Sequence, residues 1–135
     1  FFSQPINMAQ VTGKVLGCKQ LKSKDLWGKS DPYVKVICGD SEYKTDAIDD
    51  SEDPVWADAT FAFGGLDMES DICFIVLDKD MGGDDEIGRA HVPLHLIPHD
   101  EPTTFTFSIG MNAPKKNPGT ITVEMQLQPP EGFFD

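Results

Sequence analysis

Apolar and polar residues alternate along short stretches of this chain, most clearly near its C-terminal end. Over residues 120–127 every second residue is apolar, and the residues between them are Thr, Glu or Gln. A period of two is that of a β-strand with one buried face, because successive side chains point to opposite sides. Residues 104–109 follow the same pattern, which predicts that Phe105, Phe107 and Ile109 point inward.

Six more stretches fit strands, although each departs from simple alternation. Over residues 11–21 the apolar spacing widens after Val15, which indicates a strand that ends in a bulge. The other five are apolar or β-branched runs; Gly39-Asp40-Ser41 joins the first two as a hairpin, and Gly64-Gly65 is expected to end the third. These runs are residues 33–38, 42–48, 60–63, 72–77 and 87–94.

Short strands, with no long helical pattern and no internal repeat, predict an all-β fold, an eight-stranded antiparallel β-sandwich. A length of 135 residues is enough for a single core. We expect the domain to span residues 9–128. Residues 1–8 are expected to be an N-terminal extension, with Met8-Ala9 as a candidate native start, and residues 129–135 a C-terminal tail.

The charge of the chain restricts its partners. It has 23 acidic and 11 basic residues, a formal net charge of −12 at pH 7. Such a chain lacks the basic face that nucleic-acid binding requires, and an anionic membrane repels it. Membrane contact would therefore have to be switched on by added cations.

The cysteines and the apolar runs bear on the compartment. Cys18, Cys38 and Cys73 are odd in number and form no C-x-x-C pair, which favours reduced, buried thiols in a reducing compartment. No apolar run approaches the roughly 18 residues of a membrane span, and no basic-then-apolar signal peptide begins the chain. We expect a cytoplasmic protein that associates with membranes peripherally.

Two acidic, glycine-containing loops carry the candidate chemistry. One covers residues 25–31 and the other residues 78–85, each between strand-like runs. Carboxylates roughly 4 Å apart repel one another, so a fold keeps such a cluster when a cation completes it. Oxygen ligands without nearby thiolate or imidazole suit Ca²⁺. The second loop is not an EF-hand, because Arg89 stands where that motif has its Glu.

These loops also carry a family resemblance that covers roughly residues 9–127. Asp25 followed by Ser30-Asp31-Pro32-Tyr33-Val34 resembles the first calcium loop of C2 domains, and Asp78-x-Asp80 before Ile87-Gly88 resembles their third. Between them, Lys44-Thr45, then Asp53-Pro54-Val55-Trp56 and Phe61-Ala62-Phe63 resemble further signatures of the family. The strand order resembles the circularly permuted topology called type II, with the strand before Asp25 first.

The resemblance implies a site that binds two calcium ions, and it indicates which residues are the ligands. The fifth carboxylate is ambiguous, because this loop is one residue shorter than the usual pattern. Counting back from Gly88 gives Asp85, Asp84 is its neighbour and the second choice, and counting forward from Asp80 gives Glu86. The implied ligands are the side chains of Asp25, Asp31, Asp78, Asp80 and Asp85, with the backbone carbonyls of Lys24 and Lys79.

Other residues suggest contacts with lipid. Leu26 and Trp27 lie at the predicted tip of the first loop and Met81 at that of the second, and an indole favours the membrane interface. We expect these three residues to insert. Lys35 and Lys44 resemble the phosphoinositide-binding lysine groove of some C2 domains; the alternative is an ordinary solvated face.

The function predicted from the sequence is a calcium-dependent phospholipid-binding module that targets itself or a parent protein to anionic membranes. The alternative is a calcium-independent C2-like domain for protein interaction or scaffolding. No nucleophile lies in a recognisable catalytic motif, so we do not expect an enzyme. Trp56, unlike Trp27, is expected in the core.

Overall fold

The computed structural model describes residues 8–21, 29–110 and 119–133, and within them the regular secondary structure is β-strand apart from one short 3-10 helix. The elements are β1 (Met8–Lys19), β2 (Pro32–Cys38), β3 (Ser41–Lys44), β4 (Thr60–Asp67), β5 (Asp71–Asp78), β6 (Asp85–Pro93), the 3-10 helix η1 (Leu94–Leu96), β7 (Thr103–Ser108) and β8 (Thr120–Gln128). In the part of the chain described here, no helix is long and apolar enough to cross a membrane.

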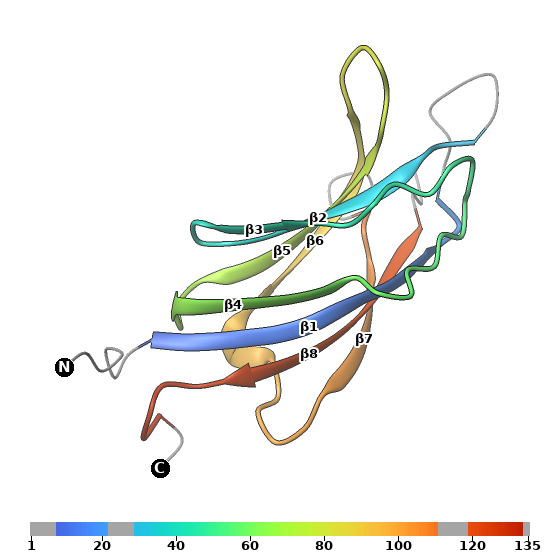
Figure 1. Cartoon of the computed structure of the whole chain (residues 1–135). Coiled ribbons are helices and arrows are strands. Elements are labelled where there is room, and N and C mark those ends of the chain that lie inside the picture. Colours follow the sequence, from blue (N-terminus) through green and yellow to red (C-terminus); the bar gives the residue numbers. More distant parts are fainter. Residues whose placement is uncertain (1–7, 22–28, 111–118, 134–135) are drawn as a thin grey trace.

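The strands form two packed layers (Figure 1). One sheet has the order β4-β1-β8-β7 and the other β3-β2-β5-β6, and every pairing between named strands is antiparallel. This is the predicted eight-stranded antiparallel sandwich. The first strand leads toward the acidic segment and lies beside the last strand, β8, as the permuted order requires.

Alternating side chains from both sheets fill the core. In β8 the four apolar residues of the alternation are at most 1% exposed, and in β5 Ile72, Phe74 and Val76 are fully buried. The predicted bulge in β1 is present, because its register with β8 shifts between Val15 and Gly17. Phe105 and Phe107 are half-buried and pack against the core, and Trp56 is buried as predicted.

Two expected strand ends were wrong, for local reasons. Gly64-Gly65 does not end β4, because Gly65 adopts a φ of 64° and the strand continues past a bulge in its pairing with β1. The hairpin strand β3 ends at Lys44 instead of Ile48. There the Val34 N–H donates to the Thr45 hydroxyl (2.9 Å) instead of to a backbone carbonyl of the neighbouring strand, and the hydroxyl donates to the Asp46 carbonyl (2.9 Å).

Candidate metal and membrane site

The described parts of both acidic segments meet at one end of the sandwich. Asp31 immediately precedes β2, and Asp78 ends β5, where it lies opposite Pro32 in the strand pairing. The Lys79 N–H donates to the Asp31 carbonyl at 3.0 Å, which ties the second segment to the first. The connection between β5 and β6 projects beyond the sheets at this end (Figure 1).

Asp31 and Asp78 are joined through the backbone. Asp78 is only 4% exposed, and its Oδ1 accepts the Asp31 N–H at 2.9 Å. Asp31 Oδ1 in turn accepts the Asp50 N–H at 2.7 Å. Among the residues that the structure describes, each of these two carboxylates receives hydrogen bonds at one oxygen only.

The three candidates for the fifth carboxylate lie in different surroundings. Asp85 is paired directly with Asp78 between β5 and β6, so both side chains are on the same side of the sheet. Asp84 accepts hydrogen bonds from the Tyr33 hydroxyl and from the Asp80 N–H (3.0 Å). Glu86 forms an ion pair with Arg89, whose Nε donates to Glu86 Oε2 at 2.9 Å.

The contact between Tyr33 and Asp84 changes the acidity of both groups. The hydrogen bond from Tyr33, supported by the one from the Asp80 backbone, holds the pKa of Asp84 below its ordinary value. The same hydrogen bond, together with desolvation, raises the pKa of Tyr33 to about 12. Asp84 is therefore ionised and Tyr33 neutral at physiological pH, which is the pair of states in which the hydroxyl donates to the carboxylate.

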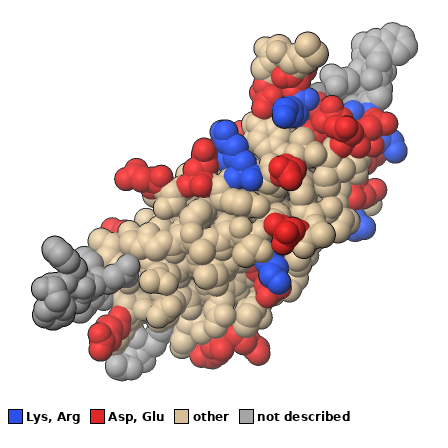
Figure 2. Space-filling model, viewed as in Figure 1, with Lys and Arg blue, Asp and Glu red and all other residues tan. Residues whose placement is uncertain are grey.

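The loop between β5 and β6 presents an apolar residue above its acids. The Gly83 N–H donates to the Asp80 carbonyl at 3.3 Å and Gly83 adopts a φ of 127°, so a turn carries Met81 outward. Met81 is fully exposed. Figure 2 shows acidic side chains gathered below an uncharged tip and along the adjoining edge of the molecule.

The donor chemistry fits a hard cation, but the described residues do not complete a metal site. In residues 8–21, 29–110 and 119–133, no three His, Cys, Asp or Glu side chains are grouped closely enough to hold a metal. The predicted residues Lys24, Asp25, Leu26 and Trp27 lie outside the described residues. The structure thus brings Asp31, Asp78 and Asp85 to one end and directs Asp84 toward Tyr33.

Sequence reasoning missed the residues that connect this end of the molecule. Asp50, in the segment after β3, accepts the Lys29 N–H at 2.8 Å while its own N–H binds Asp31. Asp53 accepts the Gln20 N–H at 2.8 Å, so the same segment holds the end of β1. The Asp and Ser residues within residues 49–53 were the available signal, since such side chains bind nearby backbone N–H groups in turns.

The two lysines of the predicted groove lie opposite each other in β2 and β3. Lys35 pairs with Lys44 in register, so both are on one face of the sheet. Glu42 lies 3.8 Å from the Lys35 ammonium and offsets part of this charge. The described structure therefore offers a mixed-charge face here rather than a strongly basic groove.

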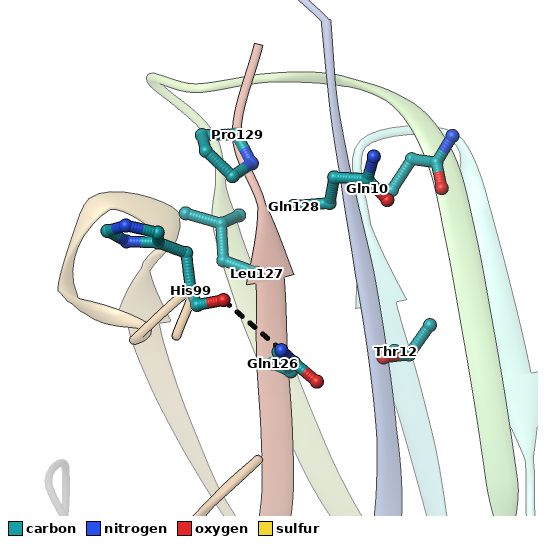
Figure 3. Close-up of a pocket in the computed structure, with 7 residues that line it drawn as sticks. All are labelled: Gln10, Thr12, His99, Gln126, Leu127, Gln128 and Pro129. Carbon is teal, nitrogen blue, oxygen red and sulfur yellow. Dashed lines mark hydrogen bonds between the residues drawn. The ribbon is translucent and has the colours of Figure 1, made fainter. Parts of the chain in front are cut away.

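A polar cavity of about 270 Å³ lies near the opposite end, on the outer face of the β4-β1-β8-β7 sheet (Figure 3). The Gln126 amide donates to the His99 carbonyl at 3.1 Å. Among the described residues, the lining of the cavity is formed by amide, hydroxyl, imidazole and apolar side chains and includes no carboxylate, and such a lining does not suit a hard cation. The residues that line it are Gln10, Thr12, His99, Gln126, Leu127, Gln128 and Pro129.

The family follows from comparison with known proteins. The model of the C2 domain family matches residues 9–109, so this chain belongs to the C2 domain family. C2 domains are non-catalytic modules. The sandwich also superposes on a C2 domain of plant extended synaptotagmin 1 with a TM-score of 0.78 and 26% identity, covering 94% of this chain and 98% of that one.

Two relatives from Arabidopsis thaliana are much longer than this chain. A calcium-dependent lipid-binding protein is 42% identical over 85 residues, which are 62% of this chain and 16% of that protein. Multiple C2 domain and transmembrane region protein 8 is 37% identical over 86 residues, which are 63% of this chain and 9% of that protein. The chain therefore corresponds to a small part of each relative.

Proposed function

We propose that this C2 domain binds anionic phospholipid surfaces in a calcium-dependent manner. The observation that carries the proposal is the acidic end of the sandwich, which holds Asp31, Asp78, Asp85 and the exposed Met81. The similarity to a protein described as calcium-dependent and lipid-binding supports the same chemistry.

The residues that would hold calcium are Asp31, Asp78, Asp80 and Asp85, with Asp25 and the carbonyls of Lys24 and Lys79 as further ligands. The position of Asp85 beside Asp78 supports it over Asp84 and Glu86, which have other partners. Calcium, when bound, would supply positive charge and coordination positions that lipid phosphate or carboxylate oxygens can complete.

The chain's own charges explain why binding would depend on the cation. With a net charge of −12, the acidic end repels anionic headgroups when its carboxylates are not neutralised. Five ligand carboxylates would be nearly balanced by two divalent ions, so the repulsion would fall where Met81, Leu26 and Trp27 meet the interface. The change is local and needs no rearrangement of the sandwich.

Co-sedimentation with vesicles tests the proposal. Vesicles of phosphatidylserine and phosphatidylcholine are mixed with the chain in millimolar calcium or in chelator. We expect the chain in the pellet with calcium and in the supernatant with chelator. Equal sedimentation under both conditions would favour a calcium-independent surface, and no sedimentation under either condition would favour the protein-interaction alternative.

Substitution of Trp27 by Ala tests the membrane step separately. Calcium affinity in solution should hardly change, because an indole supplies no ligand to a hard cation. Vesicle affinity should fall by about 2 kcal/mol, since the indole would bury on the order of 100 Å² at about 25 cal/mol per Å². The change is measured by vesicle titration.

The matched control for Trp27→Ala is Leu96→Ala, because Leu96 is an exposed apolar residue (58%) on η1, away from the acidic loops. Loss of vesicle affinity in both variants would mean that the loop tip has no special role. Equal affinity of the Trp27 variant and the unmodified chain would leave a purely electrostatic contact, which salt should abolish.

A further inference from the structure

Tyr33 is an almost buried phenol on the outer face of a sheet. It lies in β2 next to the core residue Val34, so alternation places its ring on the opposite, outer face of the β3-β2-β5-β6 sheet. The residue is nevertheless only 9% exposed. Its hydroxyl donates to a carboxylate 51 residues later in the chain, on the loop between β5 and β6.

The Asp84 carboxylate joins two parts of that loop to the sheet. One oxygen accepts from Tyr33 and the other from the Asp80 N–H at 3.0 Å. The Gly83 N–H closes the turn onto the Asp80 carbonyl at 3.3 Å. The backbone of Asp80 is therefore held at both its N–H and its carbonyl, and the chain of contacts ends on the fixed ring of Tyr33.

This arrangement separates the roles of neighbouring acids. Asp78 lies on the core-facing side of β5, in alternation with Val76, and Asp85 is paired with it. Asp84 instead reaches the outer face, where Tyr33 lies. Its two carboxylate oxygens already accept hydrogen bonds from the sheet and from the loop.

We propose that Tyr33 and Asp84 form a tether that positions Asp80 and the β5–β6 loop, and that Asp84 acts through this tether rather than as a calcium ligand. Tyr33 is thus a positioning residue for the site. The inference rests on the proposed function for its effect on calcium, but not for its effect on the loop itself.

The effect on the loop is measured first, without calcium. NMR order parameters of the backbone amides of residues 80–84 should be near 0.85 in the unmodified chain, as for rigid backbone, and below about 0.6 in Tyr33→Phe and in Asp84→Ala. The matched control is Tyr43→Phe on the neighbouring strand β3, whose hydroxyl has no hydrogen-bond partner among the described residues. Unchanged order parameters in Tyr33→Phe would overturn the tether.

Calcium titration then separates a tether from a ligand. Tyr33→Phe and Asp84→Ala should each lower calcium affinity by about tenfold, and the double variant should lose no more than either single one, because both remove the same contact. Asp84→Asn should be much milder than Asp84→Ala, since an amide can still accept from Asp80 and meet the tyrosine hydroxyl. Losses that add in the double variant, or Asn as harmful as Ala, would overturn the positioning role.

These two experiments can refute the tether and the proposed function separately. Calcium binding that is absent from the unmodified chain would end the proposed function, whereas loosening of residues 80–84 by Tyr33→Phe would still support the tether. Asp85→Asn serves as the opposite control: it should weaken calcium binding while the order parameters of residues 80–84 stay unchanged. An equal loosening of the loop by Asp85→Asn would contradict the separate roles of the two neighbours.

Discussion

The two ends of the sandwich use aspartate in different ways. Near the end with the polar cavity, Asp67 accepts the Glu69 N–H at 2.9 Å, two residues along the chain, and so closes its own turn between β4 and β5. At the acidic end, Asp78 accepts the Asp31 N–H, 47 residues away. Asp67 is thus a local turn former, whereas Asp78 links distant segments.

This difference shows which carboxylates are worth testing for function. A turn aspartate is explained by the turn that it closes. A carboxylate that is only 4% exposed, as in Asp78, is costly unless hydrogen bonds or a cation offset its charge. The hydrogen bonds between distant segments bring acidic residues to one end of the sandwich. The alternation of apolar and polar residues along the strands does not distinguish the two ends.

The largest effect is expected from replacing two acids of the acidic end. Asp31→Asn with Asp80→Asn should lower calcium affinity by at least about hundredfold, because even changes next to metal ligands cost roughly 10- to 100-fold. The fold should persist, since an Asn oxygen can still accept the Asp50 N–H and the mutual repulsion falls. Isothermal titration calorimetry measures the affinity, and circular dichroism the fold.

Asp67→Asn is the matched control for that double variant, at the other end of the molecule. It makes the same chemical change in an aspartate that only closes a turn. Calcium affinity should be unchanged. A comparable loss in Asp67→Asn would show that general charge, rather than the acidic end, governs binding.

The next effect is the stabilisation of the folded chain by calcium. Binding to the native state alone adds about 2.7 kcal/mol to the free energy of unfolding when calcium is at 100 times its Kd. Magnesium should add much less, because it requires a tighter octahedral shell. Thermal unfolding in calcium, in magnesium or in chelator measures this stabilisation. A melting temperature that does not change in millimolar calcium would contradict the metal assignment.

Much of the fold followed from the sequence because it depends on local pattern. The period of two in residues 120–127 predicted β8 and its buried face. Gly64-Gly65 misled because a glycine pair can equally end a strand or form a bulge, and only the partner strand decides which. Thr45 likewise ended β3 through a side-chain bond to Val34 of the neighbouring strand.

The site was less predictable, because it depends on which face each side chain takes. Counting along the loop left Asp84, Asp85 and Glu86 as alternatives. The register between β5 and β6 shifts between Val76 and Leu77, and this irregularity decides which of them lies beside Asp78. The role of Tyr33 depends on a hydrogen bond to a residue 51 positions later in the chain, and the sequence alone does not show that these two residues are in contact.

A smaller effect is expected from adding a methyl group at Gly88, and almost none from adding one at Gly64. A Cβ at Gly88, where β6 nears the acidic end, would lie 2.3 Å from the Ile109 carbonyl oxygen, so the backbone must shift. Gly88→Ala should cost about 2 kcal/mol of unfolding free energy. At Gly64, in β4, the nearest atom would be 3.7 Å away, an ordinary contact, so Gly64→Ala should be near neutral.

Urea unfolding compares these two glycine variants. The result bears on the comparison of the ends because Gly88 lies three residues after Asp85 and pairs with Val76, next to the register shift between β5 and β6. If Gly88→Ala were as stable as Gly64→Ala, the close approach of β6 to the segment after β7 would not be rigid. The position of Asp85 would then be less fixed than its pairing with Asp78 indicates.

The smallest effect is expected at the polar cavity, and it tests whether that end takes part at all. Gln126→Ala removes one hydrogen bond, to the His99 carbonyl, from an exposed position. A typical hydrogen bond contributes about 1 kcal/mol, and less where water replaces the lost partner, so unfolding free energy should fall by about 1 kcal/mol at most. Calcium affinity and vesicle binding should match those of the unmodified chain, because none of the described residues that line this cavity carries a carboxylate. A loss of vesicle binding in Gln126→Ala, with calcium affinity unchanged, would mean that lipid contacts the end with the polar cavity. The membrane-binding role would then belong to that end and not to the acidic end.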